Sequence, residues 1–189
     1  MSELKIKTVE DSKTEVSHLL FSKHMNSAGR LFGGQLLMWI DEVAGIVARR
    51  HCEGNLTTAC IDNLQFKEPC YENDVIVIIG YVTHVGRSSM EIRIDTYVER
   101  PDGSRHPVNR AFFVMVALDA NNKPVEVPRL KIQTIDEQAK WDAAEKRIEL
   151  RKQRRDEGFN PPVSSFLLYL MTAAPTHFSV FNAVIRQSD

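Results

Sequence analysis

The chain has 189 residues, of which 43% are hydrophobic and 26% are charged, and its formal net charge is -1. This balance is typical of a soluble globular domain that is long enough to bury an apolar core. It excludes the overall positive field that a general nucleic-acid-binding protein carries, so we do not expect nucleic acid as a partner.

The amino-terminal residues and the cysteines indicate the cellular compartment in which the protein is expected. The first ten residues, MSELKIKTVE, contain no apolar run of signal-peptide length. Cys52, Cys60 and Cys70 are an odd number of cysteines without metal-site spacing, which is typical of reduced thiols. We therefore expect a cytoplasmic protein without a metal centre. Residues 1–13 are polar and are expected to be flexible.

The stretch from residue 24 to residue 52 combines a glycine-containing loop with an amphipathic helix. Apolar residues recur at steps of three and four and fill one arc of about 140° on a helical wheel. They are Leu36, Leu37, Ile40, Val43, Ala44, Val47 and Ala48. An arc of this width predicts a helix buried against a sheet. Asp41 lies just beyond the edge of the arc, where a carboxylate is either held by hydrogen bonds or kept for chemistry.

The residues before this helix are candidates for a catalytic site. Gly33 and Gly34 lie where a helix has unpaired N–H donors, which favour a developing negative charge. Together with Asp41 and the amide of Asn26, they form a plausible set for hydrolysing an acyl compound. The alternative is that the two glycines form an ordinary turn at the start of the helix.

Several β-like runs follow a first candidate strand, with little helix between them. Residues 89–99 alternate most regularly, which predicts one buried face and one wet face. The predicted strands are 14–21, 57–66, 75–85, 89–99 and 109–118. We predict an α+β domain over residues 14–130, with one antiparallel sheet wrapped around the long central helix. Such a sheet has edge strands, and pairing two protomers edge to edge removes one of them, so a dimer is expected.

Short motifs in a fixed order give the chain a resemblance to a known family. Asn26, Gly29, Phe32, Gly33 and Gly34, followed by Asp41, resemble the pattern of the hotdog-fold acyl-CoA thioesterases. The acyl-CoA hydrolase branch is especially similar, above all the second hotdog domain of the cytosolic brain-type long-chain acyl-CoA hydrolases. Further matches lie at 41–52, 66–69, 86–91 and 125–128, within a resemblance that spans residues 14–155.

The resemblance implies a hotdog fold and the hydrolysis of acyl-CoA to free fatty acid and coenzyme A, with no cofactor. Asp41 would be the general base on water or the nucleophile, and the two routes stay open. Gly33 and Gly34 would form the oxyanion site, and Asn26 would orient the water or the thioester. The family also implies homodimers, often assembled into hexamers as trimers of dimers. Because this chain carries both Asn26 and Asp41, a homodimer could build its site from two protomers.

Two further segments are assigned less specifically. By resemblance, Arg87, Ser88 and Ser89 lie near the nucleotide portion of coenzyme A, and an ordinary polar turn is an equal alternative. Residues 131–158 form a charged helix. Its basic residues are expected to be a solvated face, with contact to coenzyme A phosphates as the alternative. They are Arg147, Arg151, Lys152, Arg154 and Arg155.

The apolar segment 159–189 departs from the family pattern, and we expect it to be an interface or docking segment. Pro175 and His177 interrupt it before it reaches the ~20 residues that span a bilayer, so no membrane span is expected. Two other function classes remain open for the whole chain. One is a hydroxyacyl-thioester dehydratase, which the Asn26 and Asp41 pair disfavours. The other is a non-catalytic acyl-CoA-binding sensor. The absence of a G-x-S-x-G motif disfavours a serine hydrolase of the α/β type.

Overall fold

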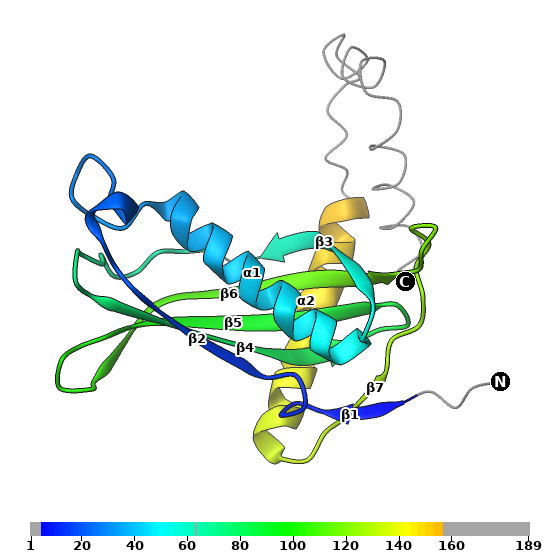
Figure 1. Ribbon diagram of the computed structural model, residues 1–189. Coiled ribbons are helices and arrows are strands. Elements are labelled where there is room, and N and C mark those ends of the chain that lie inside the picture. The colour runs from blue at the N-terminus through cyan, green and yellow to red at the C-terminus, as the bar shows by residue number, and fades with distance from the viewer. Residues whose placement is uncertain (1–4, 63, 157–189) are drawn as a thin grey trace, which may run out of the picture.

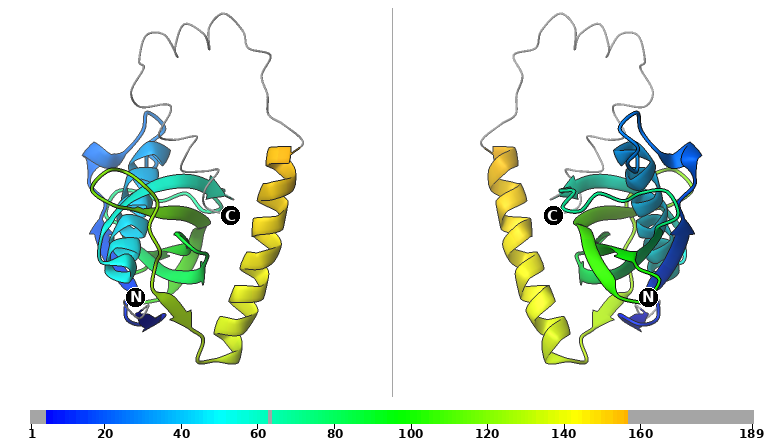
Figure 2. Two further views of the ribbon diagram at one scale, coloured as in Figure 1. Left: turned by 90° about the vertical axis from the view of Figure 1, so that its right-hand side faces the viewer. Right: turned by 90° about the vertical axis from the view of Figure 1, so that its left-hand side faces the viewer.

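The computed structural model describes residues 5–62 and 64–156, which form three layers. A five-stranded antiparallel sheet lies between two helices, with α1 (Gly33–Cys52) on one face and α2 (Ile135–Asp156) on the other (Figures 1 and 2). The sheet order is β2-β4-β5-β6-β3, so β2 and β3 are its edges. These strands are Thr14–Leu19, Val75–Val85, Ser89–Glu99, Arg105–Leu118 and Asn55–Asp62. This is the predicted arrangement of one sheet around a long helix.

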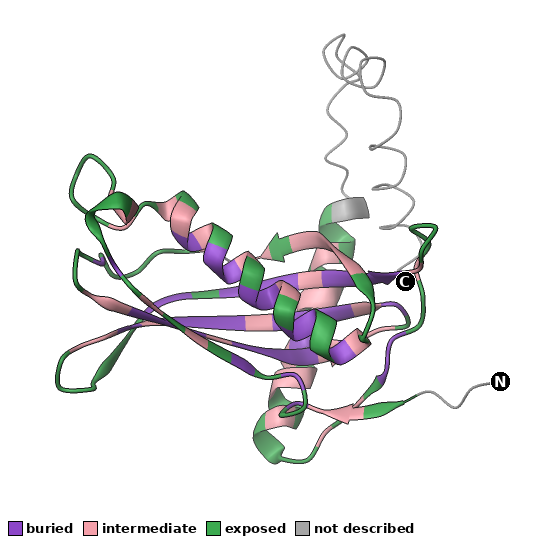
Figure 3. Cartoon of the chain, viewed as in Figure 1, coloured by how far each residue is buried: buried purple, intermediate pink, exposed green. Residues whose placement is uncertain are grey.

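The core lies between α1 and the concave face of the sheet. The helix turns its apolar arc inward and leaves its polar side exposed (Figure 3). Gly80 in the middle of β4 permits the close approach, because a Cβ there would lie 2.8 Å from Ile94 and 3.0 Å from Val43. Trp39, beyond the edge of the predicted arc, and His51, a polar residue within it, are also buried.

Three short elements were not predicted from the sequence. The segment 1–13 was expected to be flexible, but Ile6–Thr8 form a short strand, β1. It pairs in parallel with β7 (Arg129–Lys131), in a separate two-stranded sheet. A single 3-10 turn, η1 (Ser22–His24), follows β2. Strands of three residues carry no detectable period, which is why β1 and β7 were missed.

The second face of β5 was predicted to be wet, and this prediction is wrong. Glu91 and Asp95 have only 3% and 6% of their surface exposed, because α2 lies across that face. The burial is tolerated because both carboxylates are paired with arginines.

Two other expectations concern the carboxyl-terminal part of the chain. Among the described residues, no helix combines the length and apolarity needed to cross a bilayer. The apolar segment 159–189 lies outside the described residues.

Candidate functional site

The loop that leads into α1 is held by its own backbone and by Asn26. The side-chain Oδ1 of Asn26 accepts hydrogen bonds from the backbone N–H groups of Ala28 (2.9 Å) and Arg30 (3.2 Å). These bonds, typical of an asparagine turn, use only the oxygen of the amide. Within the described residues the two N–H donors of Asn26 make no hydrogen bond, so they are free to face a ligand.

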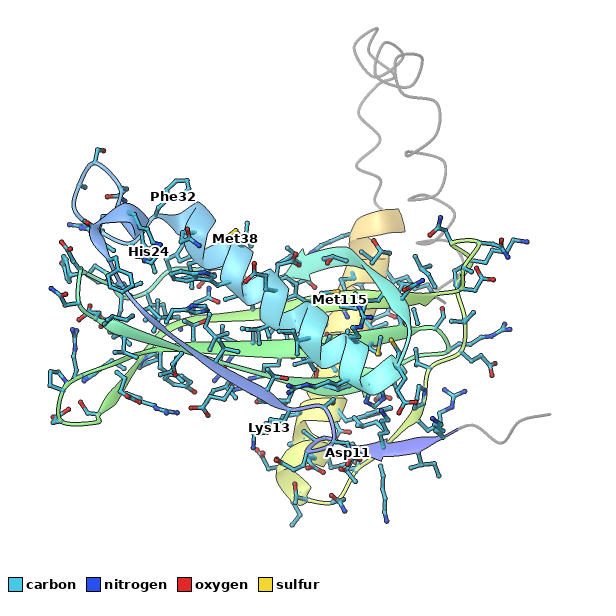
Figure 4. The ribbon with its side chains drawn as sticks, viewed as in Figure 1. Asp11, Lys13, His24, Phe32, Met38 and Met115 are labelled. Atoms are coloured by element: carbon cyan, nitrogen blue, oxygen red, sulfur yellow. The ribbon has the colours of Figure 1, made fainter. Side chains whose placement is uncertain are left out.

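Aromatic contacts fix this loop against α1. The ring of Trp39 stacks on His18 with centroids 4.2 Å apart and makes a T-shaped contact with His24 with centroids 5.1 Å apart. The backbone carbonyl of His24 accepts a hydrogen bond from Phe32 N–H at 2.9 Å, and Figure 4 shows both residues at the start of α1. Burial lowers the pKa of His18, which favours the neutral imidazole in this stack. The loop carrying Asn26 is therefore tied to the helix it precedes.

The start of α1 keeps its N–H groups available. The residue before the helix, Phe32, supplies no side-chain cap. The first N–H groups of the helix therefore remain available as hydrogen-bond donors, as at any uncapped helix start. A Cβ on Gly34 would lie 2.5 Å from the Phe32 ring, and a Cβ on Gly33 would lie 3.6 Å from the Phe66 ring. Glycine at position 34 lets the Phe32 ring pack beside the donors, whereas a Cβ at position 33 would make only an ordinary contact with Phe66.

Asp41 has a partner that sequence reasoning missed. Thr58, on β3, donates its hydroxyl to Oδ1 of the half-buried Asp41 at 3.1 Å. A β-bulge between Thr58 and Cys60 shifts the register of β3 on β6. No signal in the sequence identifies Thr58, because it lies on another element and meets Asp41 only through the packing of β3 beside α1.

A cavity of about 350 Å³ brings some of the predicted site residues together. Asn26 and Gly33 line its rim, and Leu31, Leu36 and Val108 form an apolar floor. Asp41 does not line it, because it lies eight residues along α1, about 12 Å from Gly33 at 1.5 Å per residue. Within a single chain, Asn26 and the start of α1 therefore lie at the same cavity, and Asp41 does not.

Cys70 also lines the cavity but is not suited to act as a nucleophile. Burial, followed by the nearby charge of Asp74, raises the pKa of the Cys70 thiol to about 11. The thiol is therefore protonated at neutral pH. Among the residues that the structure describes, no group of three or more His, Cys, Asp or Glu could hold a metal ion.

The turn at Arg87, Ser88 and Ser89 lies away from this cavity. It joins β4 to β5, closed by a hydrogen bond from Gly86 N–H to the Ser89 carbonyl at 2.8 Å. The strand end at Val75 lies near the loop before α1, so the turn lies at the opposite end of the sheet (Figure 1). Arg87 is exposed and 3.3 Å from Glu126, whereas Ser88 is buried with no partner for its hydroxyl in the described structure.

The basic residues of α2 were expected to form a solvated face, and for two of them this is wrong. Arg147 donates to Glu91 at 2.7 Å and lies over the Phe112 ring, and Arg151 bonds both Asp62 (2.7 Å) and Glu91 (3.0 Å). These arginines hold α2 on the sheet. Arg154 is 3.7 Å from Asp62 and Lys152 is exposed, while the side chain of Arg155 lies outside the described part.

Comparison with known proteins identifies the family. Residues 28–103 match the thioesterase superfamily. The uncharacterized acyl-CoA thioester hydrolase YkhA of Bacillus subtilis is 37% identical over 147 residues, which are 77% of this chain and 86% of that protein. The chain belongs to the acyl-CoA thioester hydrolase family. The resemblance, the hotdog fold and the enzyme class predicted from the sequence are thereby confirmed.

A longer relative of this acyl-CoA thioester hydrolase is the rat cytosolic acyl coenzyme A thioester hydrolase. It is 34% identical over 159 residues, which are 82% of this chain but only 41% of the rat protein. The chain thus spans less than half of that relative.

Solved structures agree with the family assignment. The crystal structure of an apo-hexameric acyl-CoA thioesterase has a TM-score of 0.77 and 35% identity, over 80% of this chain and 98% of that one. The Staphylococcus aureus acyl-CoA hydrolase, in complex with butyryl coenzyme A, coenzyme A and coenzyme A disulfide, has a TM-score of 0.76 and 29% identity, over 87% and 98%. It has also been solved with alanine in place of an asparagine, an aspartate and a threonine.

Proposed function

We propose that this member of the family hydrolyses acyl-CoA to free fatty acid and coenzyme A, with the carboxylate of Asp41 as its general base or nucleophile. The observation that carries the proposal is the set of Asn26, Asp41 and Thr58. These residues occur in the same order and at the same sequence separations as the three residues replaced by alanine in the Staphylococcus aureus hydrolase. The hydrogen bond from Thr58 to Asp41 supports a shared role for two of them.

The chemistry follows from the groups present. Asp41 would take a proton from a water that attacks the thioester carbonyl carbon, after which the C–S bond breaks and the departing coenzyme A thiolate takes that proton. Alternatively, Asp41 would itself attack that carbon and expel the thiolate to give an anhydride; water then hydrolyses the anhydride, and its proton goes to the thiolate. Either route places negative charge on the carbonyl oxygen, and the N–H groups of Gly33 and Gly34 would stabilise it. Thr58 occupies Oδ1 of Asp41, which leaves Oδ2 for the water or the substrate. The free N–H donors of Asn26 would orient the carbonyl or the water.

The active site would be shared between two protomers of a homodimer, with Asn26 and the helix start from one and Asp41 from the other. The separation of Asp41 from the cavity within one chain supports this arrangement. Strand β3 is an edge, and the exposed side chains of Met38, Ile46 and Ile61 give α1 and β3 an apolar surface that a partner would cover. Hexameric relatives support a further assembly, which for this protein would be a trimer of dimers. The cytosolic rat relative supports a cytoplasmic location.

Arg87 and Ser89 would bind the nucleotide portion of coenzyme A, whereas the hydroxyl of Ser88, expected from the sequence to act with them, is buried within the chain. A guanidinium group and hydroxyls suit phosphate oxygens, and Arg87 is 73% exposed at its side chain. Replacing Arg87 with alanine is expected to raise KM for acyl-CoA and to leave KM unchanged for a thioester truncated to N-acetylcysteamine. Equal effects on both thioesters would place Arg87 outside the nucleotide site.

The first test is coenzyme A release from acyl-CoA substrates of C2 to C18, with wild type beside Asp41→Asn. The variant is expected to lose about 100-fold or more in kcat, because it removes the group that moves the proton. Glu42→Gln is the matched control, since Glu42 is the next residue of α1, has the same charge and is exposed. Full activity of Asp41→Asn would refute the catalytic role proposed for Asp41. Tight binding of acyl-CoA without turnover by the wild type would identify a sensor instead.

A further inference from the structure

One wall of the candidate substrate cavity is a single irregular segment, residues 64–70, which follows β3. Consecutive residues of this segment line the cavity: Phe66, Lys67, Glu68, Pro69 and Cys70. The remainder of the cavity belongs to the loop before α1, which the hydrogen bonds of Asn26 close, to the start of α1 and to the core. The width of the cavity therefore depends on how the 64–70 segment is held.

The segment is attached to β6 at the point where that strand loses its neighbour. The last pair between β3 and β6 is Asp62 with Phe112, so the earlier part of β6 has a free edge on this side. The carbonyl of Val108 accepts a hydrogen bond from Lys67 N–H at 2.9 Å. The side-chain Nδ2 of Asn109 donates to the carbonyl of Gln65 at 2.7 Å. At its other end, the segment is held by Leu31 N–H, which donates to the Cys70 carbonyl at 2.8 Å.

The two bonds to β6 flank Phe66, the residue between Gln65 and Lys67. The ring of Phe66 lies beside Gly33 at the start of α1, 3.6 Å from the position of a Gly33 Cβ. The side chain of Phe66 is 51% exposed, so packing against the core does not fix it. Its place beside the helix start is instead fixed by the backbone on either side, which Asn109 and Val108 hold.

Asn109 is an unusual residue for its position. It is only 4% exposed, and its Oδ1 has no partner among the described residues. Burying an unpaired amide oxygen is unfavourable, and an apolar side chain would pack there without that cost. The orientation of the amide is set by Gln65, because the opposite orientation would place two oxygens against each other. The bond to Gln65 is thus the feature that accounts for an asparagine here.

We propose that Asn109 is a positioning residue: it holds the 64–70 segment against β6 and thereby sets the width of the cavity beside the thioester. The width of the cavity in turn determines which acyl chains the protein accepts, by their bulk and length. The selectivity part rests on the thioesterase function proposed above, whereas the attachment of the segment does not.

The attachment is tested by hydrogen exchange of the Lys67 amide, which needs no substrate. Asn109→Leu keeps the side chain's size and removes the donor, so the Lys67 amide is expected to exchange at least about fivefold faster than in the wild type. The matched control is Thr96→Val. Thr96 pairs with Asn109 across β5 and β6 and is also buried with an unpaired hydroxyl, but it makes no hydrogen bond to the segment. Unchanged exchange in Asn109→Leu, or equal acceleration in Thr96→Val, would overturn the attachment.

The selectivity is tested with kcat and KM for a short, a long and a branched acyl-CoA. In Asn109→Leu the ratio of kcat/KM between long and short chains is expected to change at least about threefold, through KM, while Thr96→Val keeps the wild-type ratio. Phe66→Ala alters only an exposed ring and so does not endanger folding; it is expected to change the same ratio. Faster Lys67 exchange with unchanged ratios in both variants would refute the selectivity role. A wild type without turnover would refute the thioesterase function, and the exchange result would still decide the attachment.

Discussion

Thr58 links the edge of the sheet to the candidate acid on α1. Its hydroxyl donates to Asp41 and also lies 3.3 Å from the sulfur of Met115. Because a hydroxyl has one hydrogen, it serves the carboxylate by donating while the sulfur makes the weaker contact. The bond would fix the direction of Oδ2, the oxygen proposed to take the proton.

Replacing Thr58 with valine is expected to lower kcat about 10- to 100-fold with little change in KM. The physical reason is that a hydrogen bond to a charged group is worth about 1.5–3 kcal/mol, and here it would act on the acid rather than on substrate binding. Thr57→Val is the control, since alternation along β3 turns Thr57 to the other face of the sheet. Steady-state kinetics on one acyl-CoA check this, and a change confined to KM would contradict it.

His51 gives the protein a predictable response to acid. It is fully buried at the end of α1, its Nε2 donates to the Pro128 carbonyl at 3.0 Å, and its Nδ1 has no partner among the described residues. Burial lowers the pKa of His51, and Lys7 lowers it further, against the opposing effects of the Pro128 bond and Asp11. The folded protein therefore holds a neutral imidazole under conditions in which the unfolded chain binds a proton.

A base with a lowered pKa stabilises the fold fully above its unfolded pKa of about 6.5, and this contribution is lost as the pH falls towards the folded pKa. The free energy of unfolding is therefore expected to fall between pH 7.5 and pH 5. His51→Gln, which cannot be charged, is expected to reduce this pH dependence, measured by urea denaturation at both pH values. His106→Gln is the control at an exposed position. An identical pH dependence in His51→Gln and wild type would show that His51 does not contribute.

At the scale of elements, α2 is held by charge and by aromatic rings. Glu91 on β5 is 2% exposed at its side chain and accepts bonds from Arg147, Arg151 and the hydroxyl of Thr83. Around it, Trp141 packs on His84 with centroids 4.0 Å apart. A buried carboxylate with three donors is strongly dependent on its partners, because removing either side leaves uncompensated charge.

Glu91→Gln is expected to lower the free energy of unfolding by about 2–3 kcal/mol, because it leaves two arginines facing a neutral amide. Asp136→Asn breaks the pair with Lys140 on the same helix and is expected to lower the free energy of unfolding much less, because solvent screens the exposed carboxylate. Urea denaturation compares the two variants. Equal losses would mean that Glu91 does not fasten α2, and a rise in KM for acyl-CoA in Arg147→Ala without loss of stability would restore the coenzyme A role for that arginine.

The sequence predicted the elements better than their contacts. Periodicity alone predicts the strands at 75–85 and 89–99 and the helix within residues 24–52. In each of these segments the order of apolar and polar residues indicates which faces are buried. The outer face of β5 could not be predicted, because Glu91 and Asp95 alternate with apolar residues as a solvated face does. Only the position of α2 distinguishes the two cases. Thr58 was missed for a similar reason, since its partner is 17 residues away on another element and only the packing of β3 beside α1 brings the two together.

At the scale of the whole molecule, one chain contains every proposed catalytic residue but does not assemble them. Asn26 and Gly33 share a cavity, and Asp41 lies further along the same straight helix, which cannot fold back on itself. Helix geometry therefore keeps Asp41 about 12 Å along the axis from Gly33 within one protomer. A second copy is the simplest source of the missing acid, because it would bring identical residues across a two-fold axis.

Mixing inactive subunits tests this arrangement. Asn26→Ala and Asp41→Ala are each expected to be nearly inactive as homodimers, since both sites of such a dimer lack the same group. In a mixed dimer one site loses both groups and the other keeps both. Random reassociation of equal amounts would make about half of the dimers mixed, each with one intact site, so activity is expected to return to about a quarter of the wild-type level.

The mixture must be shown to exchange subunits, which two different affinity tags and a pull-down would establish before the assay. The matched control mixes Asp41→Ala with Asp41→Asn, two variants that lack the same acid and should give no recovery. If mixed dimers form and activity does not return, the site lies within one chain, and α1 or the loop at Asn26 must move to close the distance to Asp41. Recovery that follows the fraction of mixed dimers, and is absent from the control, would mean that the catalytic unit of this protein is the dimer.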